Sequence, residues 1–236
     1  MRDFLSVSAA ADELGVHPSR VRALIASGAL SAEKVSGAWL VDRAGIAGRA
    51  RQQAPAGRPL SPHNAWALLL AASGEDLPSG LEPSARWRIR RALDTYGLDA
   101  LHPRLVRRAE PSSYWVLPGE MRAMRERSDL VLSGPSAAAT YDLGLVGSDA
   151  IDAYVPARLV ASLQREHAME RMSGPESNVV VRAVPNGAWL LDGRRSAPLA
   201  AVAVDLCSYA DPRAARIGAD LIARIDHELK TRESTA

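Results

Sequence analysis

The stretch SVSAAADELGVHPSRVRALIASGAL, residues 6–30, predicts two short helices joined by a tight turn. Ser8 suits the N-cap of the first helix, and Gly15 can adopt the left-handed conformation that ends it. Pro18 suits the first position of the second helix, because the missing N–H has no helical partner there. Gly28 stops the second helix. The stretch therefore predicts a helix, a turn and a second helix.

The second predicted helix has an apolar face and an opposite face of small residues and arginines. Val21, Leu24 and Ile25 recur at helical spacing and must pack on the first helix. At about 100° per residue, the opposite face is turned outward. Its residues are Ser19, Arg20, Arg22, Ala23 and Ala26. Small side chains allow close approach to another surface while guanidinium groups reach base edges or phosphates, which suits a DNA major groove.

Two short β-prone runs follow, in LSAEKVSGAWLVDR, residues 30–43, and predict a hairpin. A hairpin placed after such a helix forms a wing, and we expect Lys34 and Arg43 on it to contact phosphates. We expect Trp39 to anchor the wing in the small core rather than to stack on a base.

Residues 5–43 resemble the excisionase and MerR-type winged helix-turn-helix. The family pattern SVxxAAxxLGVxxxRVxxLIxxGxLxAxKVGGxWxV is matched by Ser6-Val7, Ala10-Ala11, Leu14-Gly15-Val16, Arg20-Val21, Leu24-Ile25, Gly28, Leu30, Lys34-Val35, Gly37 and Trp39. The resemblance implies binding of double-stranded DNA, with the second helix in the major groove and the hairpin on flanking phosphates.

Charge is distributed unevenly along the 236 residues, although the net charge is only +2. Residues 85–127 carry ten arginines and five acids, whereas residues 128–236 carry eleven bases and fourteen acids. A polyanionic partner for the first half would explain this asymmetry, and solvated helix faces are the alternative. Between the hairpin and residue 60, Arg49 and Arg51 lie in a linker without acids, which either follows a DNA backbone or is simply solvated.

The pattern of the remaining chain predicts a mixed α+β protein. We expect a winged helix-turn-helix domain in residues 1–48, a linker in 49–60, a basic and mostly helical segment in 61–128, and an α/β domain in 129–236. The basic segment has two interpretations, a second winged helix that also binds DNA, or a helical connector with a solvated arginine face. Short strands are expected at Leu105–Val106 and Tyr114–Leu117 within it.

Few residues suggest catalysis or a cofactor site. A single cysteine, Cys207, excludes an intramolecular disulfide and a cysteine-rich zinc site. The five histidines show no paired spacing, and no phosphate-binding glycine loop is present, so we expect no cofactor, no metal and no enzyme. The strongest alternative is a divalent metal on Asp205, at the end of an expected strand, and Asp211. However, Asp211 also suits a helix cap, and Arg213 could pair with Asp205 instead.

Residues 60–225 resemble the AbiEi-type antitoxin and transcriptional-regulator group, in which a strand ending in DL precedes a DxR helix, here in AVAVDLCSYADPR. The resemblance implies a repressor of its own operon that antagonises a nucleotidyltransferase-type toxin. The excisionase-like front is a departure that places the toxin partner in doubt. A ligand-sensing regulator and a metal-dependent nucleic-acid enzyme remain the alternatives. Without an apolar run of about 18–20 residues or a signal-type start, we expect a cytoplasmic protein that makes no membrane contact.

Overall fold

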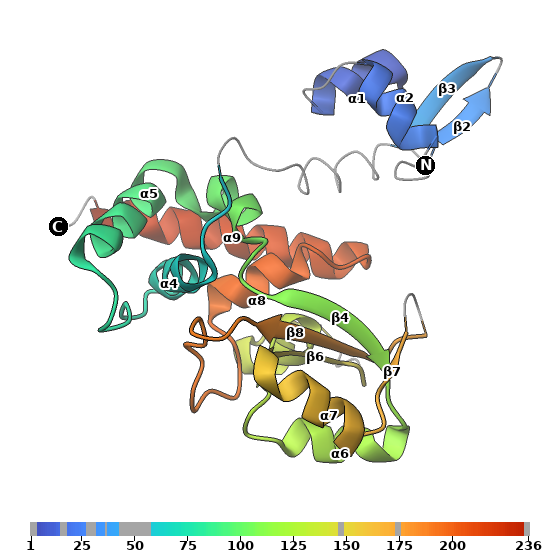
Figure 1. Ribbon diagram of the computed structural model, residues 1–236. Coiled ribbons are helices and arrows are strands. Elements are labelled where there is room, and N and C mark those ends of the chain that lie inside the picture. The colour runs from blue at the N-terminus through green and yellow to red at the C-terminus, as the bar shows by residue number, and fades with distance from the viewer. Residues whose placement is uncertain are drawn as a thin grey trace. The chain divides into compact units, whose positions relative to one another are not determined.

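The computed structural model describes residues 4–14, 18–26, 32–35, 37–42, 58–145, 149–172 and 176–233. The chain divides into two compact units, residues 1–56 and 57–236, and each is described by itself. Helices and sheets occur in both units (Figure 1), which confirms the mixed α+β class.

Unit 1 consists of two helices and a three-stranded antiparallel sheet of strand order β1-β3-β2. Its elements are β1 (Phe4–Ser6), α1 (Val7–Leu14), α2 (Pro18–Ala26), β2 (Ala32–Val35) and β3 (Ala38–Asp42). The expected helix pair and hairpin are therefore present. The first helix begins two residues earlier than expected, at Val7, because the hydroxyl of Ser6, not that of Ser8, accepts a hydrogen bond from Ala9 N at 3.1 Å. Gly37, in the hairpin turn, has a φ of +83°, which favours glycine.

Small apolar residues form the core of unit 1. Ala10 and Ala11 of α1, Val21 of α2 and Val41 of β3 are buried together, and Ile25 packs against them. Val21 and Ile25 confirm the apolar stripe of α2, whereas the side chain of Leu24 lies outside the described residues. The stripe therefore fixes which face of α2 points inward.

Unit 2 is built around a five-stranded sheet of order β5-β6-β8-β4-β7, in which only β6 and β8 run parallel. The strands are β4 (Glu110–Trp115), β5 (Val131–Leu132), β6 (Ile151–Pro156), β7 (Glu170–Arg171) and β8 (Val179–Val184). The helices are α4 (Pro62–Ala72), α5 (Pro83–Leu101), α6 (Pro118–Glu126), α7 (Val160–Glu166), α8 (Leu199–Leu206) and α9 (Pro212–Glu233). Three 3-10 helices, η1 (His102–Leu105), η2 (Gly134–Tyr141) and η3 (Ala157–Leu159), complete the described part of the unit.

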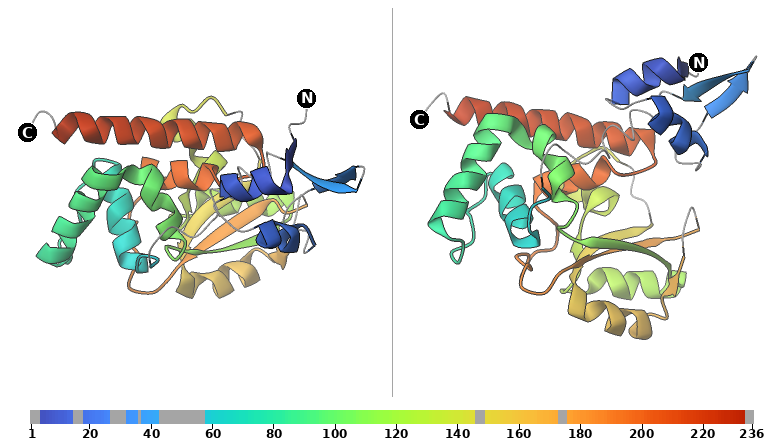
Figure 2. Two further views of the ribbon diagram at one scale, coloured as in Figure 1. Left: turned by 90° about the horizontal axis from the view of Figure 1, so that it is seen from above. Right: turned by 45° about the horizontal axis from the view of Figure 1, so that its top comes forward.

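Helices cover both faces of this sheet (Figures 1 and 2). Helices α6 and α7 pack on one face around Met124 and Leu163. Helix α8 lies on the other face, and α4, α5 and α9 pack around it to form the larger core. Because side chains alternate along a strand, Ile151, Ala153 and Val155 of β6 face the first core, and the intervening residues face α8.

Helix α5 is broken at Gly97, where φ is +72° and ψ is 171°. The carboxylate of Asp226, on α9, accepts hydrogen bonds from the backbone N–H groups of Leu98 and Asp99, the latter at 3.1 Å. A Cβ at Gly97 would lie 2.8 Å from that carboxylate. Glycine therefore both permits the break and leaves room for the cap provided by α9.

Several sequence expectations for unit 2 need correction. Leu105 ends a 3-10 turn rather than forming a strand with Val106. The run Leu199–Leu206 is a fully packed helix, α8, so Asp205 does not end a strand. Residues 58–128 contain one strand, β4, which pairs with β7 and β8, so the hairpin of a second winged helix is not formed within them. The same sheet joins the predicted segments 61–128 and 129–236, because its other strands come from the second.

Candidate nucleic-acid interface

The outward face of α2 carries a hydroxyl and a guanidinium group. Ser19 and Arg22 are exposed, whereas Val21 between them in sequence is completely buried. Arg20 and Ala23 lie on the same helix, but their side chains are outside the described residues. The burial of Val21 thus sets the orientation of α2 and leaves Arg22 available to an external partner.

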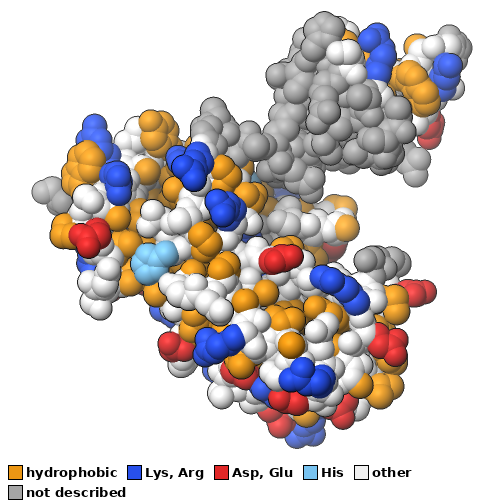
Figure 3. Space-filling view, viewed as in Figure 1, with side chains coloured by type: hydrophobic (Ala, Val, Ile, Leu, Met, Phe, Trp, Pro, Cys, Tyr) orange, Lys and Arg blue, Asp and Glu red, His pale blue; other side chains and the backbone are white. Residues whose placement is uncertain are grey.

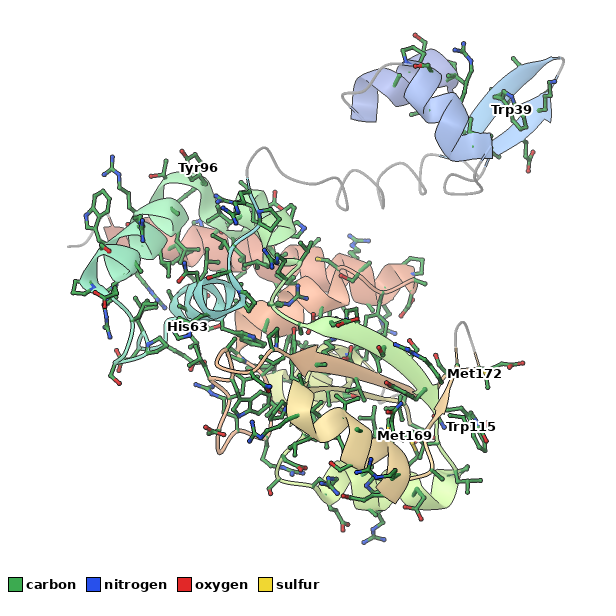
Figure 4. The ribbon with its side chains drawn as sticks, in the orientation of Figure 1. Trp39, His63, Tyr96, Trp115, Met169 and Met172 are labelled. Atoms are coloured by element: carbon green, nitrogen blue, oxygen red, sulfur yellow. The ribbon has the colours of Figure 1, made fainter. Side chains whose placement is uncertain are left out.

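The hairpin presents a cation and an indole ring side by side. Lys34 of β2 and Trp39 of β3 are direct cross-strand partners, and the Lys34 Nζ lies 5.8 Å from the centre of the Trp39 ring. Trp39 is 37% exposed and stands on the hairpin (Figure 4), so the expectation that it anchors the core is wrong. Among the described residues, the buried core of unit 1 consists of Ala10, Ala11, Val21 and Val41.

The cation–π contact has a chemical consequence for this surface. It places the Lys34 ammonium group over the face of the Trp39 ring while both side chains remain exposed. Val35, next to it, is 48% exposed. A flat aromatic ring beside a cation offers stacking or van der Waals contact to a sugar and a charge to the adjoining phosphate. Three other predicted contacts, Arg43, Arg49 and Arg51, lie outside the described residues.

A buried ionic cluster lies between the sheet of unit 2 and α8. Asp205 of α8 is fully buried and binds the guanidinium groups of Arg108 and Arg182, the latter with an N–O distance of 3.1 Å. The Ser133 hydroxyl donates to its second oxygen at 2.5 Å. Burial raises the pKa of Asp205, but the two guanidinium groups and the Ser133 hydroxyl together lower it more. The pKa of the folded Asp205 carboxyl therefore lies below the usual value for aspartate.

The strand residues of this cluster come from adjacent positions on the sheet face turned toward α8. Tyr154 and Arg182 are partners in the β6–β8 register, and Asp152 lies two residues before Tyr154, on the same face of β6. Arg182 donates to both oxygens of Asp152, at 2.7 and 2.8 Å. The Tyr209 hydroxyl donates to Asp152 at 2.6 Å, and burial together with that carboxylate raises the pKa of Tyr209.

Arg108 closes the cluster from the segment before β4. Its Nε donates to the Tyr154 hydroxyl at 3.0 Å, and its backbone oxygen accepts the indole N–H of Trp66 at 3.1 Å. Trp66 also meets the Tyr154 ring edge-on, with centroids 4.7 Å apart. Each buried charge thus has an opposite charge or hydrogen-bond partner, which is the condition for holding ions in a core.

Asp205 and Asp211, which were considered as ligands of one divalent metal ion, have separate hydrogen-bond partners in this structure. The oxygens of Asp205 bind Arg108, Arg182 and Ser133, whereas the exposed Asp211 accepts hydrogen bonds from the backbone of Arg213 and Ala214 at the start of α9. Arg213 donates to the Gly144 carbonyl and not to Asp205. Within the described ranges, no group of three or more His, Cys, Asp or Glu side chains is placed to hold a metal ion.

Sequence reasoning did not group a second set of arginines. Arg58, Arg88, Arg104 and Arg107 line one groove on unit 2. Three of them belong to the arginine-rich residues 85–127, which was a signal in the sequence, whereas Arg58 lies 30 residues before Arg88. The part of the chain that the structure describes includes no helix long and apolar enough to cross a bilayer.

Comparison with known proteins adds no relative to these observations. No protein-family model, curated protein or solved structure matches the chain.

Proposed function

We propose that the protein is a sequence-specific DNA-binding transcriptional regulator whose unit 1 acts as a winged helix-turn-helix. The observation that carries this proposal is the orientation of α2, in which Val21 is buried and Ser19 and Arg22 are exposed. The hairpin that follows, with exposed Lys34, supplies the element that a wing requires. The similarity of residues 5–43 to excisionase and MerR-type modules supports the same assignment.

In this proposal α2 and the hairpin contact different parts of the DNA. Helix α2 enters the major groove, where Arg22 and the neighbouring Arg20 reach base edges or phosphates. The hairpin holds flanking backbone through Lys34 and Trp39, with Arg43 next to it in sequence. One module of this size buries only about 600–1,000 Å² on DNA, so selective binding needs two copies. We therefore expect a homodimer on half-sites about 10 bp apart.

The test is binding of the full chain to a duplex from its own promoter region, measured by fluorescence anisotropy against a scrambled duplex. Replacing Arg22 by Ala should weaken promoter binding by about 1–3 kcal/mol if it contacts a base. It should also reduce the preference over the scrambled duplex. Arg165→Ala, which removes an exposed arginine from α7, is the matched control and should change neither value. Equal affinity of the wild-type protein for both duplexes would contradict sequence-specific regulation.

The biological role extends this proposal. The similarity of residues 60–225 to AbiEi-type regulators supports a repressor of its own operon that antagonises a nucleotidyltransferase-type toxin. A reporter driven by its own promoter should be repressed by the wild-type chain and released by Arg22→Ala. Expression of a nucleotidyltransferase-like toxin gene from the same operon should arrest growth, and co-expression of this chain should relieve that arrest. Repression that depends on an added small molecule would favour the ligand-sensing alternative.

A further inference from the structure

Unit 2 carries a groove of about 620 Å³ between α4, the first half of α5 and η1. Its rim holds the side chains of Arg58, Arg88, Arg104 and Arg107, together with Ser61 and Asn64. None of the described residues that line it is acidic. Lys and Arg side chains also gather over α5 and the segment beside it in the space-filling view (Figure 3). The groove is therefore a concentrated positive site, not part of a mixed surface.

Backbone contacts fix the walls of this groove. Leu60 N donates to the Arg104 carbonyl at 3.0 Å, and the Arg104 Nε donates to the Arg58 carbonyl at 3.2 Å. These bonds tie the chain entering unit 2 to η1. The floor is formed by buried side chains of α4 and α5, including Leu68 and Ile89. Arg88 on α5 and Arg104 on η1 thus project from packed helical elements, which reduces the entropy lost when they bind an anion.

Two of the groove arginines, Arg88 and Arg107, differ from those that stabilise the fold of unit 2. Arg127 binds Asp129 and Glu166, Arg194 binds Glu75, and Arg86 donates to carbonyl oxygens before α5. Arg88 and Arg107 are exposed, and among the described residues neither has an ion-pair partner. Guanidinium groups clustered without acids repel one another, so the groove gains stability when an anion enters.

The start of α4 adds to this positive field. Its N-cap, Ser61, accepts a hydrogen bond from Asn64 N, and both residues line the groove. The N-terminal end of a helix carries a partial positive charge, which favours phosphate. His63 lies in the same first turn (Figure 4). Arginine forks, hydroxyl and amide groups and a helix N-terminus together match the chemistry of phosphate recognition.

We propose that this groove binds the sugar-phosphate backbone of the same duplex DNA that unit 1 reads. The inference rests on the proposed function. Residues 43–58 join the hairpin to the groove, and they contain four arginines and no acid. Because this segment links the two units covalently, DNA held by unit 1 is presented to the groove at high local concentration. Contacts to phosphate carry no sequence information, so the groove adds affinity and salt dependence without altering the sequence that is preferred.

The test measures the affinity of the full chain for the promoter duplex over a salt series from about 50 to 200 mM. In the double variant Arg88→Gln/Arg107→Gln, the slope of log affinity against log salt should become less steep by about 1.8, since each lost phosphate contact removes about 0.9. The ratio of affinities for promoter and scrambled duplex should stay at its wild-type value. Arg88→Lys/Arg107→Lys, which keeps the charge, should retain most of the wild-type slope.

The matched control is Arg165→Gln/Arg216→Gln, which removes two exposed arginines from α7 and α9, outside the groove. It should leave the slope unchanged. A wild-type slope in the groove variant would overturn this inference while leaving the function of unit 1 intact, whereas a wild-type chain that fails to bind any duplex would overturn both. Binding of ATP that is lost in the groove variant, together with an unchanged DNA slope, would also overturn it and assign the groove to a free phosphorylated ligand.

Discussion

Replacing Asp205 by Asn tests the role of the buried ionic cluster in unit 2. The substitution keeps the size of the side chain and an oxygen for the Ser133 hydroxyl, but it removes the negative charge between Arg108 and Arg182. Arg182 retains both oxygens of Asp152, whereas Arg108 keeps only neutral acceptors, the Tyr154 hydroxyl and the Leu105 carbonyl. The loss of stability therefore comes mainly from Arg108, whose buried charge is left without a carboxylate partner.

Removing one partner from a buried ion pair costs about 3–5 kcal/mol. Since part of the network survives, we expect a loss of about 3 kcal/mol in the free energy of unfolding, and for a unit of this size a fall in Tm of about 6–12 °C. Urea unfolding followed by tryptophan fluorescence measures this loss, because Trp66 contacts both Arg108 and Tyr154. Asp220→Asn, an exposed position on α9, is the control and should cost almost nothing.

The pH dependence gives an independent check. Because the pKa of Asp205 is lowered by folding, its stabilising contribution is complete above the unfolded pKa of about 3.9 and is lost as the pH falls through the folded value. The difference between wild type and Asp205→Asn should thus be constant near neutral pH and shrink below about pH 4. A difference of less than about 1 kcal/mol at pH 7 would refute the reasoning, since surface pairs contribute that little.

Three further predictions concern close contacts and the DNA surface. Gly218→Ala should lower the free energy of unfolding of unit 2 by about 1–3 kcal/mol, measured by urea unfolding. The new Cβ would lie 2.7 Å from backbone atoms of Ala203 and Cys207. This overpacking outweighs the gain of about 1 kcal/mol in helix propensity that alanine brings. Gly97→Ala should cost about 1–3 kcal/mol, measured the same way, because its backbone conformation is almost restricted to glycine. Arg22→Ala should weaken promoter binding about 5- to 150-fold without changing the Tm, whereas a parallel loss of Tm would indicate a structural role.

The sequence was informative where a pattern is local. The apolar stripe of Val21 and Ile25, the helix start at Pro18 and the β-prone runs in residues 30–43 all predict elements that the structure contains. Each depends on residues close in sequence, so periodicity and capping chemistry are sufficient.

The failures have identifiable physical causes. Helix α8 is apolar except for Asp205, because the sheet, α4 and α9 enclose it. Such a run cannot be distinguished from a buried strand by periodicity. Trp39 was expected in the core as a large apolar side chain, but on β3 it is 37% exposed beside its cross-strand partner Lys34. The groove could not be predicted because Arg58 and Arg107 meet only after α4, α5 and η1 have packed.

The position of β8 in the sheet affects the order in which the two units are completed during synthesis. Its neighbours are β6 and β4, and β4 ends at Trp115, whereas β8 extends to Val184. A nascent chain emerging from the ribosome therefore lacks the middle of this sheet until 69 residues have been added after the end of β4. The described strands of unit 1 all lie before Arg43, so their pairing can be complete before the first strand of unit 2 has been translated.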